Sequence, residues 1–96
     1  MPNVIFINVF EVPEGQDEQF LQGWRAARDL LQQQPGYSST RLHKSLNPQA
    51  RFRYINVAEW ASPAQFQAAI NHPDFAKLAQ GLPFASYPSV YEVVET

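Results

Sequence analysis

Polar side chains in apolar surroundings are the first candidates for chemistry in this chain. Asn8 stands in the run from Val4 to Val12, whose other members are apolar except Glu11. An amide there can hydrogen-bond a neighbouring loop or a buried water, or it can lie under a pocket and hold a substrate carbonyl, phenol or developing oxyanion. Both interpretations of Asn8 stay open at this level.

A second polar group comes from residues 38–46, where strand alternation places Arg41, His43 and Ser45 on one face. If that face lines a cavity, His43 can accept a proton near neutral pH and Arg41 can hold the resulting anion. A solvated strand face has the same pattern, so a surface interpretation competes with the catalytic one. His72 precedes Pro73, where an imidazole caps a helix or, alternatively, contacts a substrate.

Aromatic residues make up 14% of the chain, which is rich for its length. An aromatic side chain at a cavity rim stacks on an aromatic ligand, whereas the same side chain inside the protein belongs to the core. Four residues are candidates for the wall of such a pocket: Trp60, Phe66, Phe75 and Phe84. The high aromatic content therefore indicates extra apolar surface for a partner subunit or for a ligand.

Several other chemistries have no residues to carry them. The chain has no cysteine, which excludes disulfides, thiol nucleophiles and Cys-based metal sites. Its two histidines, His43 and His72, are far apart in sequence, so we predict no metal site. The sequence also lacks the P-loop, GxGxxG, GxSxG and HExxH motifs, and we predict no cofactor.

Length and composition indicate one soluble domain over residues 1–96, since 45% of the residues are hydrophobic and 17% are charged. A net charge of −2 with only seven Lys and Arg argues against nucleic acid or an anionic membrane as partner. No apolar run approaches the roughly 20 residues of a membrane span. The start Met1-Pro2-Asn3 is not a basic signal-peptide region, so we expect a cytoplasmic protein.

The elements that position these residues follow from hydrophobic spacing. Alternating β-branched and aromatic residues predict strands over four segments: 4–12, 38–46, 51–60 and 90–94. A stripe of period 3.6 predicts a helix over 16–34. A capping box at Ser62 begins a second helix, which breaks at 72–74 and continues to about Gln80. We expect Gly81 to end that helix and residues 82–88 to form a loop.

The order strand, helix, strand, strand, helix, strand predicts an α+β fold of the ferredoxin-like, split-βαβ type. Its four-stranded antiparallel sheet carries helices on one face and leaves the other face bare. Because the strands have apolar residues on both sides, a second subunit is the simplest cover for that face. We therefore expect a homodimer.

The chain resembles the antibiotic biosynthesis monooxygenase domain family over essentially its whole length. The resemblance rests on the order and spacing of four short motifs: Phe6-Ile7-Asn8-Val9-Phe10 leading to Pro13-Glu14-Gly15, Gln34-Pro35-Gly36-Tyr37, Trp60-Ala61-Ser62-Pro63-Ala64-Gln65-Phe66, and His72-Pro73-Asp74-Phe75. It implies a dimeric α+β barrel in which two ferredoxin-like sheets pack face to face. Some members of this family oxidise polycyclic phenols to quinones with O₂ and no cofactor, and others bind and cleave haem.

The haem-degrading members use a strand Asn, a helix Trp and an iron-ligating His. By spacing, the Asn falls on Asn8, but the Trp position falls on Ala69 and the His position on Ala79. Other relatives carry a His at places that correspond here to Asp74 and Ala69. Haem binding or degradation is therefore the least favoured of the activities that the resemblance implies.

The leading hypothesis is a cofactor-independent monooxygenase that oxidises small aromatic or quinol-like compounds with O₂. In this hypothesis His43 is the base, Asn8 and Arg41 stabilise the anion, and Trp60 with the phenylalanines forms the wall. The alternative is a non-catalytic small-molecule binder or sensor on the same scaffold, because one fold serves many functions.

Overall fold

The computed structural model describes residues 3–80 and 83–96 of the chain. Within them, the elements follow the order β1 (Val4–Glu11), α1 (Asp17–Leu31), β2 (Tyr37–Lys44), β3 (Tyr54–Trp60), α2 (Pro63–Ile70), α3 (Pro73–Gln80) and β4 (Ala85–Tyr91). Strand β1 pairs antiparallel with both β3 and β4, and β3 also pairs antiparallel with β2. The four strands form one sheet of order β2-β3-β1-β4. The predicted ferredoxin-like α+β fold is confirmed.

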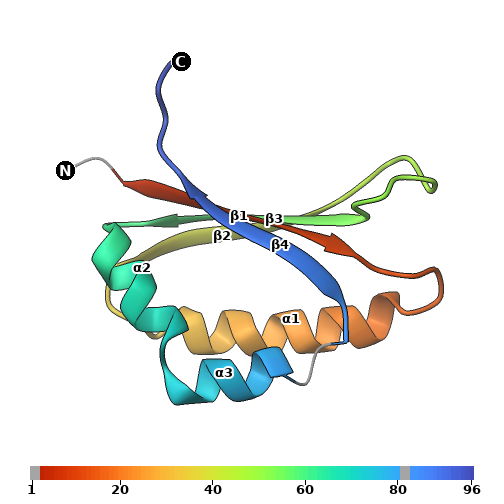
Figure 1. Cartoon of the computed structure of the whole chain (residues 1–96), viewed down its shortest axis with the longest axis horizontal. Coiled ribbons are helices and arrows are strands. Elements are labelled where there is room, and N and C mark those ends of the chain that lie inside the picture. Colours follow the sequence, from red (N-terminus) through yellow and green to blue (C-terminus); the bar gives the residue numbers. More distant parts are fainter. Residues whose placement is uncertain (1–2, 81–82) are drawn as a thin grey trace.

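All three helices cover the same face of the sheet, and no helix of the described residues lies on the other face (Figure 1). On β3 the four side chains that face the helices are buried, and they alternate with half-buried ones on the other side. The buried four are Tyr54, Asn56, Ala58 and Trp60. The other side of the sheet carries an apolar set from three strands: Ile5, Ile7, Val9, Ile55, Val57, Tyr87 and Tyr91. The uncovered face is therefore apolar in its centre.

The helix boundaries have local causes. Ser62 caps α2, because its hydroxyl accepts the backbone N–H of Gln65 at 3.2 Å, as the capping box predicts. Helix α1 ends at Leu31, three residues earlier than expected. Gln34 N–H instead bonds Leu31 C=O at 3.1 Å, a tightened turn of the kind that commonly ends a helix before a proline such as Pro35.

The last strand differs most from its prediction. Strand β4 covers 85–91 and not 90–94, and it includes half of the expected 82–88 loop. Pairing with β1 aligns Asn8 with Pro88, and Pro88 is tolerated because β4 is an edge strand with one side free of ladder bonds. The predicted helix end at Gly81 and loop start at Leu82 lie outside the described residues.

Two clusters of buried side chains lie between the sheet and the helices. One is centred on Trp60, which is 1% exposed and packs with Ala58, Phe66 and Ala69. The other is centred on Phe20, also 1% exposed, which packs with Tyr54 and Val12. Truncating either large aromatic to Ala would destabilise the fold by about 3–5 kcal/mol.

Candidate functional site

A cavity of about 460 Å³ lies between the sheet and the helices, adjoining both core clusters. All of the strands and helices contribute to its lining, which is mostly aromatic and aliphatic. This volume lies within the roughly 300–1,000 Å³ range of small-molecule sites. The cavity is therefore large enough for a ligand of a few fused rings.

The aromatic wall is built from neighbouring strands and α2. Phe6 and Phe66 have ring centroids 4.6 Å apart, and Trp60 meets Phe66 edge-on at 5.5 Å. Tyr37 contacts the other side of Trp60 at 5.6 Å. These rings pack on one another in tilted and edge-on arrangements, and together they form an aromatic wall of the cavity.

Two asparagines face the cavity from adjacent strands. Asn8 of β1 and Asn56 of β3 are direct cross-strand partners, and both line the cavity. Side chains at such positions have Cβ atoms about 4.5–5.5 Å apart. The two amides therefore form one polar spot in an otherwise apolar wall.

The two amides differ in their hydrogen bonds. Thr40 Oγ1 donates to Asn56 Oδ1 at 2.9 Å, and Asn56 is only 8% exposed. Asn8 Oδ1 is buried and has no hydrogen-bond partner among the described residues. A buried acceptor without a partner is costly, on the order of 1–3 kcal/mol, which a ligand donor could relieve.

Four sequence-predicted wall residues line this cavity: Trp60, Phe66, Phe75 and Phe84. Trp60 and Phe66 also belong to the hydrophobic core, so each is at once a core residue and part of the cavity lining. Asn8 lines the cavity with them. This position favours the interpretation in which the Asn8 amide contacts a ligand.

Arg41 and His43 do not join this group. They pair with Val57 and Ile55, whose side chains point to the uncovered face, and both are exposed. His43 Nδ1 lies 3.3 Å from the carbonyl oxygen of Ile55. Within one chain the sheet therefore separates His43 and Arg41 from Asn8, and the three side chains do not surround one ligand as the hypothesis required.

His72 is also outside the cavity lining. Its Nδ1 accepts the backbone N–H of Asp74 at 3.1 Å, at the start of α3. An imidazole in this arrangement satisfies one of the free N–H groups of a helix N-terminus. This contact fits the capping interpretation of His72.

Ala69 and Ala79 stand at the positions where the haem-degrading members carry the helix Trp and the iron-ligating His. Ala79 lines the cavity, and Ala69 is buried beneath Trp60 in the core. No histidine or carboxylate is among the described residues that line the cavity, where Tyr37 and Arg28 are the titratable groups. Across residues 3–80 and 83–96, no three His, Asp or Glu side chains gather into a group that could hold a metal ion.

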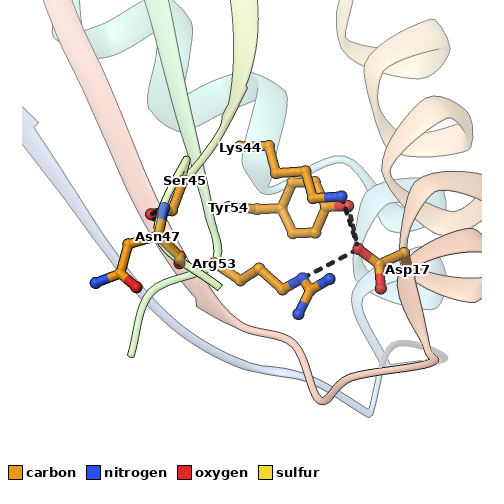
Figure 2. Close-up of polar contacts among 6 residues, drawn as sticks. All are labelled: Asp17, Lys44, Ser45, Asn47, Arg53 and Tyr54. Carbon is orange, nitrogen blue, oxygen red and sulfur yellow. Dashed lines mark hydrogen bonds and ion pairs between the residues drawn. The ribbon is translucent and has the colours of Figure 1, made fainter. Parts of the chain in front are cut away.

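A cluster of charged and polar side chains connects β2 and β3 to the start of α1 (Figure 2). Asp17 accepts hydrogen bonds from Tyr54 Oη at 2.6 Å and Arg53 Nε at 3.1 Å, and Lys44 Nζ lies 3.6 Å away. The Tyr54 hydrogen bond, opposed by partial burial and helped by the two cations, lowers the pKa of Asp17. Burial, followed by the bond to Asp17, raises the pKa of Tyr54. This cluster fixes α1 against β3, and Phe20, which stacks on Tyr54 at 4.7 Å, lines the cavity.

Sequence reasoning missed Asn56 and Thr40. Asn56 carries the same signal as Asn8, a polar residue at an alternate position among Tyr54, Ala58 and Trp60. Thr40 has no such signal, because only the register of β2 against β3 brings its hydroxyl beside Asn56.

Comparison with known proteins agrees with this architecture. The profile of the family described as antibiotic biosynthesis monooxygenase matches residues 3–81, and the chain belongs to that family. A candidate monooxygenase from Shewanella loihica PV-4 is 39% identical, with a TM-score of 0.86 over 99% of this chain and 97% of that chain. No curated protein matches the chain in sequence.

Two further solved structures share the fold. SnoaB, a cofactor-independent oxygenase from Streptomyces nogalater, is 23% identical, with a TM-score of 0.86 over 100% of this chain and 97% of that chain. The heme-degrading protein Rv3592 from Mycobacterium tuberculosis is 26% identical, with a TM-score of 0.73 over 98% and 93% of the two chains. None of the helices in the described part of this chain is long and apolar enough to cross a membrane.

Proposed function

We propose that this protein is a cofactor-independent monooxygenase that oxidises small aromatic, phenol- or quinol-like compounds with O₂ in the cavity between sheet and helices. One observation carries the proposal: two adjacent amides, Asn8 and Asn56, face an aromatic cavity of about 460 Å³. Membership of the monooxygenase family and likeness to the named oxygenases support it.

The reaction needs an electron-rich anion in a dry site. The substrate loses a proton, and its anion gives one electron to O₂, leaving a radical and superoxide. The two combine at a ring carbon as a peroxide anion, which takes up the proton lost in the first step to give a hydroperoxide. Loss of water, with the hydrogen of that ring carbon, then leaves a carbonyl. One oxygen atom enters the product, and the other leaves as water with the two hydrogens that the substrate gives up.

The protein's part is to hold the aromatic ring and stabilise the anion. The N–H donors of Asn56 lie in a mostly apolar cavity, and donors in such surroundings act strongly on a developing oxyanion. Trp60 and Phe66 orient the ring by stacking contacts. Since the described lining has no imidazole or carboxylate, the substrate's own acidity sets how readily the anion forms.

Oxygen uptake in metal-chelated buffer, with a panel of anthranol and hydroquinone substrates, tests this assignment. Asn56→Ala should lower the rate by on the order of 10²-fold, the effect of a lost oxyanion donor. Asn8→Ala should also lower it, because the free Asn8 oxygen accepts the hydroxyl proton of the bound substrate. His43→Ala and Arg41→Ala are the matched controls, because both side chains lie on the uncovered face. Full activity in both asparagine variants would contradict the assignment.

A non-catalytic binding or sensing role is the second candidate, and one observation favours it. The described lining of the cavity holds no histidine and no carboxylate, the side chains that most often act as general bases. A binder would take up phenols in the cavity without any oxygen uptake across the panel. Binding without uptake would therefore favour this role over the oxygenase.

For assembly, we propose a homodimer that buries the uncovered sheet face. Tyr87 and Tyr91 are 48% and 50% exposed in the isolated chain, beside Ile5, Ile7 and Val9 of β1. Contiguous apolar surface of this kind is typical of a subunit interface. Ile7→Glu should give a monomer by light scattering, whereas Leu46→Glu on the hairpin should leave the assembly unchanged; a wild-type monomer would contradict this proposal.

A further inference from the structure

We propose that Thr40 is a positioning residue: its hydroxyl fixes the Asn56 amide so that the NH₂ of Asn56 and the free oxygen of Asn8 together receive a ligand hydroxyl. This inference rests on the proposed function, because it takes the same cavity as the substrate site. It adds a residue and a hydrogen-bonding rule to that site.

The argument starts from the order of the strands. β3 lies between β2 and β1, so Asn56 pairs with Asn8 on one side and with Leu42 on the other, where Thr40 is its diagonal neighbour on the same face. Thr40 Oγ1 donates to Asn56 Oδ1 at 2.9 Å. The oxygen and the NH₂ of an amide diverge in one plane from the same carbon, so with the oxygen held by Thr40 of β2 the NH₂ of Asn56 is left on the side of β1 and the cavity.

An asparagine without such a partner has no fixed polarity, since its oxygen and nitrogen have nearly the same shape. The reversed amide would bring Asn56 Oδ1 toward Asn8 Oδ1, which already lacks a donor. Two acceptors side by side repel a ligand anion and offer no hydrogen-bond donor to a ligand oxygen. Asn8 Oδ1, which can only accept, favours the orientation with the NH₂ of Asn56 on its side, and the Thr40 hydroxyl holds that orientation by donating to the amide oxygen.

The resulting site has one donor and one acceptor close together. A hydroxyl group matches this pair, because it accepts from Asn56 Nδ2 and donates to Asn8 Oδ1. When the hydroxyl loses its proton, the Asn56 donor remains in place for the anion. The ligand class is therefore an aromatic ring with a free hydroxyl, in preference to the same ring with a methoxy group or no substituent.

Binding of inert probes tests this without any oxygen chemistry. We would measure Kd for 2-naphthol, 2-methoxynaphthalene and naphthalene by quenching of tryptophan fluorescence. The quantity of interest is the ratio of the naphthalene Kd to the naphthol Kd, compared between variants, because differences in probe hydration then cancel. A general loss of packing weakens all three probes and leaves this ratio unchanged.

Thr40→Val should lower that ratio by about fivefold, the effect of one hydrogen bond, whereas Thr40→Ser should keep it at the wild-type value. Ser39→Ala is the matched control, because Ser39 is the neighbouring hydroxyl and is exposed opposite Glu59. Asn8→Ala should lower the naphthol affinity and leave methoxynaphthalene unchanged, since a methoxy group has no proton to donate. An unchanged ratio in Thr40→Val would overturn the proposal.

A second measurement keeps the proposal testable if Thr40→Val fails to fold. In ¹⁵N-labelled wild-type protein, the side-chain NH₂ signals of Asn56 should move on adding 2-naphthol and not on adding naphthalene. Equal shifts with both probes, or none with naphthol, would overturn it. Naphthol binding with the predicted ratio but no oxygen uptake would contradict the oxygenase and leave the role of Thr40 standing.

Discussion

Replacing Asn56 by leucine separates the role of this residue in catalysis from its role in stability. The substitution keeps a similar volume, and it removes one hydrogen bond of 2.9 Å from a side chain that is 8% exposed. Losing that bond costs about 1 kcal/mol, and this loss is offset in part because no buried amide remains to be satisfied. The free energy of unfolding should therefore fall by about 1 kcal/mol or less.

The rate should fall far more than the stability. Removing one donor to an oxyanion lowers kcat by about 10²–10³-fold, or roughly 3–4 kcal/mol of transition-state stabilisation. Urea unfolding followed by tryptophan fluorescence gives the first quantity, and oxygen uptake with an anthranol gives the second. Arg41→Leu is the control on the uncovered face and should leave the rate of oxygen uptake unchanged.

This reasoning is refuted if Asn56→Leu retains more than a tenth of wild-type kcat while folding normally. It is also refuted if the loss of rate only follows a large loss of stability, because Asn56 would then act through the fold. A similar loss in Arg41→Leu would relocate the chemistry to the other face of the sheet.

Three further predictions concern pH and backbone geometry. The lowered pKa of Asp17 in the folded state stabilises the protein above the unfolded value of about 3.9, and this stabilisation is lost as the pH falls through the folded value. Asp17→Asn should therefore lower stability at pH 7, and its difference from wild type should shrink below about pH 4 in urea titrations. Gly36→Ala should destabilise by about 1–3 kcal/mol in thermal unfolding, because Gly36 has φ +91° and a Cβ there would lie 2.6 Å from Gln65 Cβ. For catalysis, the pH–rate profile should shift with the pKa of each substrate, since the described lining holds no histidine or carboxylate.

Each of these has its own contradicting outcome. A constant difference between Asp17→Asn and wild type from pH 7 to pH 3 would exclude the ionised carboxylate as the source of stability. Gly15→Ala is the control for Gly36, since its φ is +88° and a Cβ there has nothing within 4 Å; equal losses would mean that the contact with Gln65 has no effect. A rate profile with one fixed midpoint near pH 6.5 for all substrates would indicate a histidine base.

Much of the fold could be predicted from the sequence because its local signals agree with one another. The alternation in β3, the Ser62 capping box and the turn at Pro35-Gly36 all survive in the structure. β4 was misplaced because Pro88 argues against a strand, and only the sheet order shows that β4 is an edge where proline is tolerated.

The site could be predicted only in part. Asn8 was visible as a polar residue in an apolar strand, and the same test would have identified Asn56. Alternation grouped Arg41 with His43 correctly, yet it cannot say which face of a sheet meets the helices. The Thr40–Asn56 bond depends on the register between two strands, which no local pattern encodes.

The most direct test of the central claim is turnover of an anthranol under ¹⁸O₂ in metal-chelated buffer, followed by mass spectrometry of the quinone. We expect one ¹⁸O atom per product molecule in wild type and in His43→Ala, and at most about a hundredth of that rate in Asn56→Leu. Unlabelled quinone, or a labelled product that is lost in His43→Ala and retained in Asn56→Leu, would contradict the proposed oxygenation at the two asparagines.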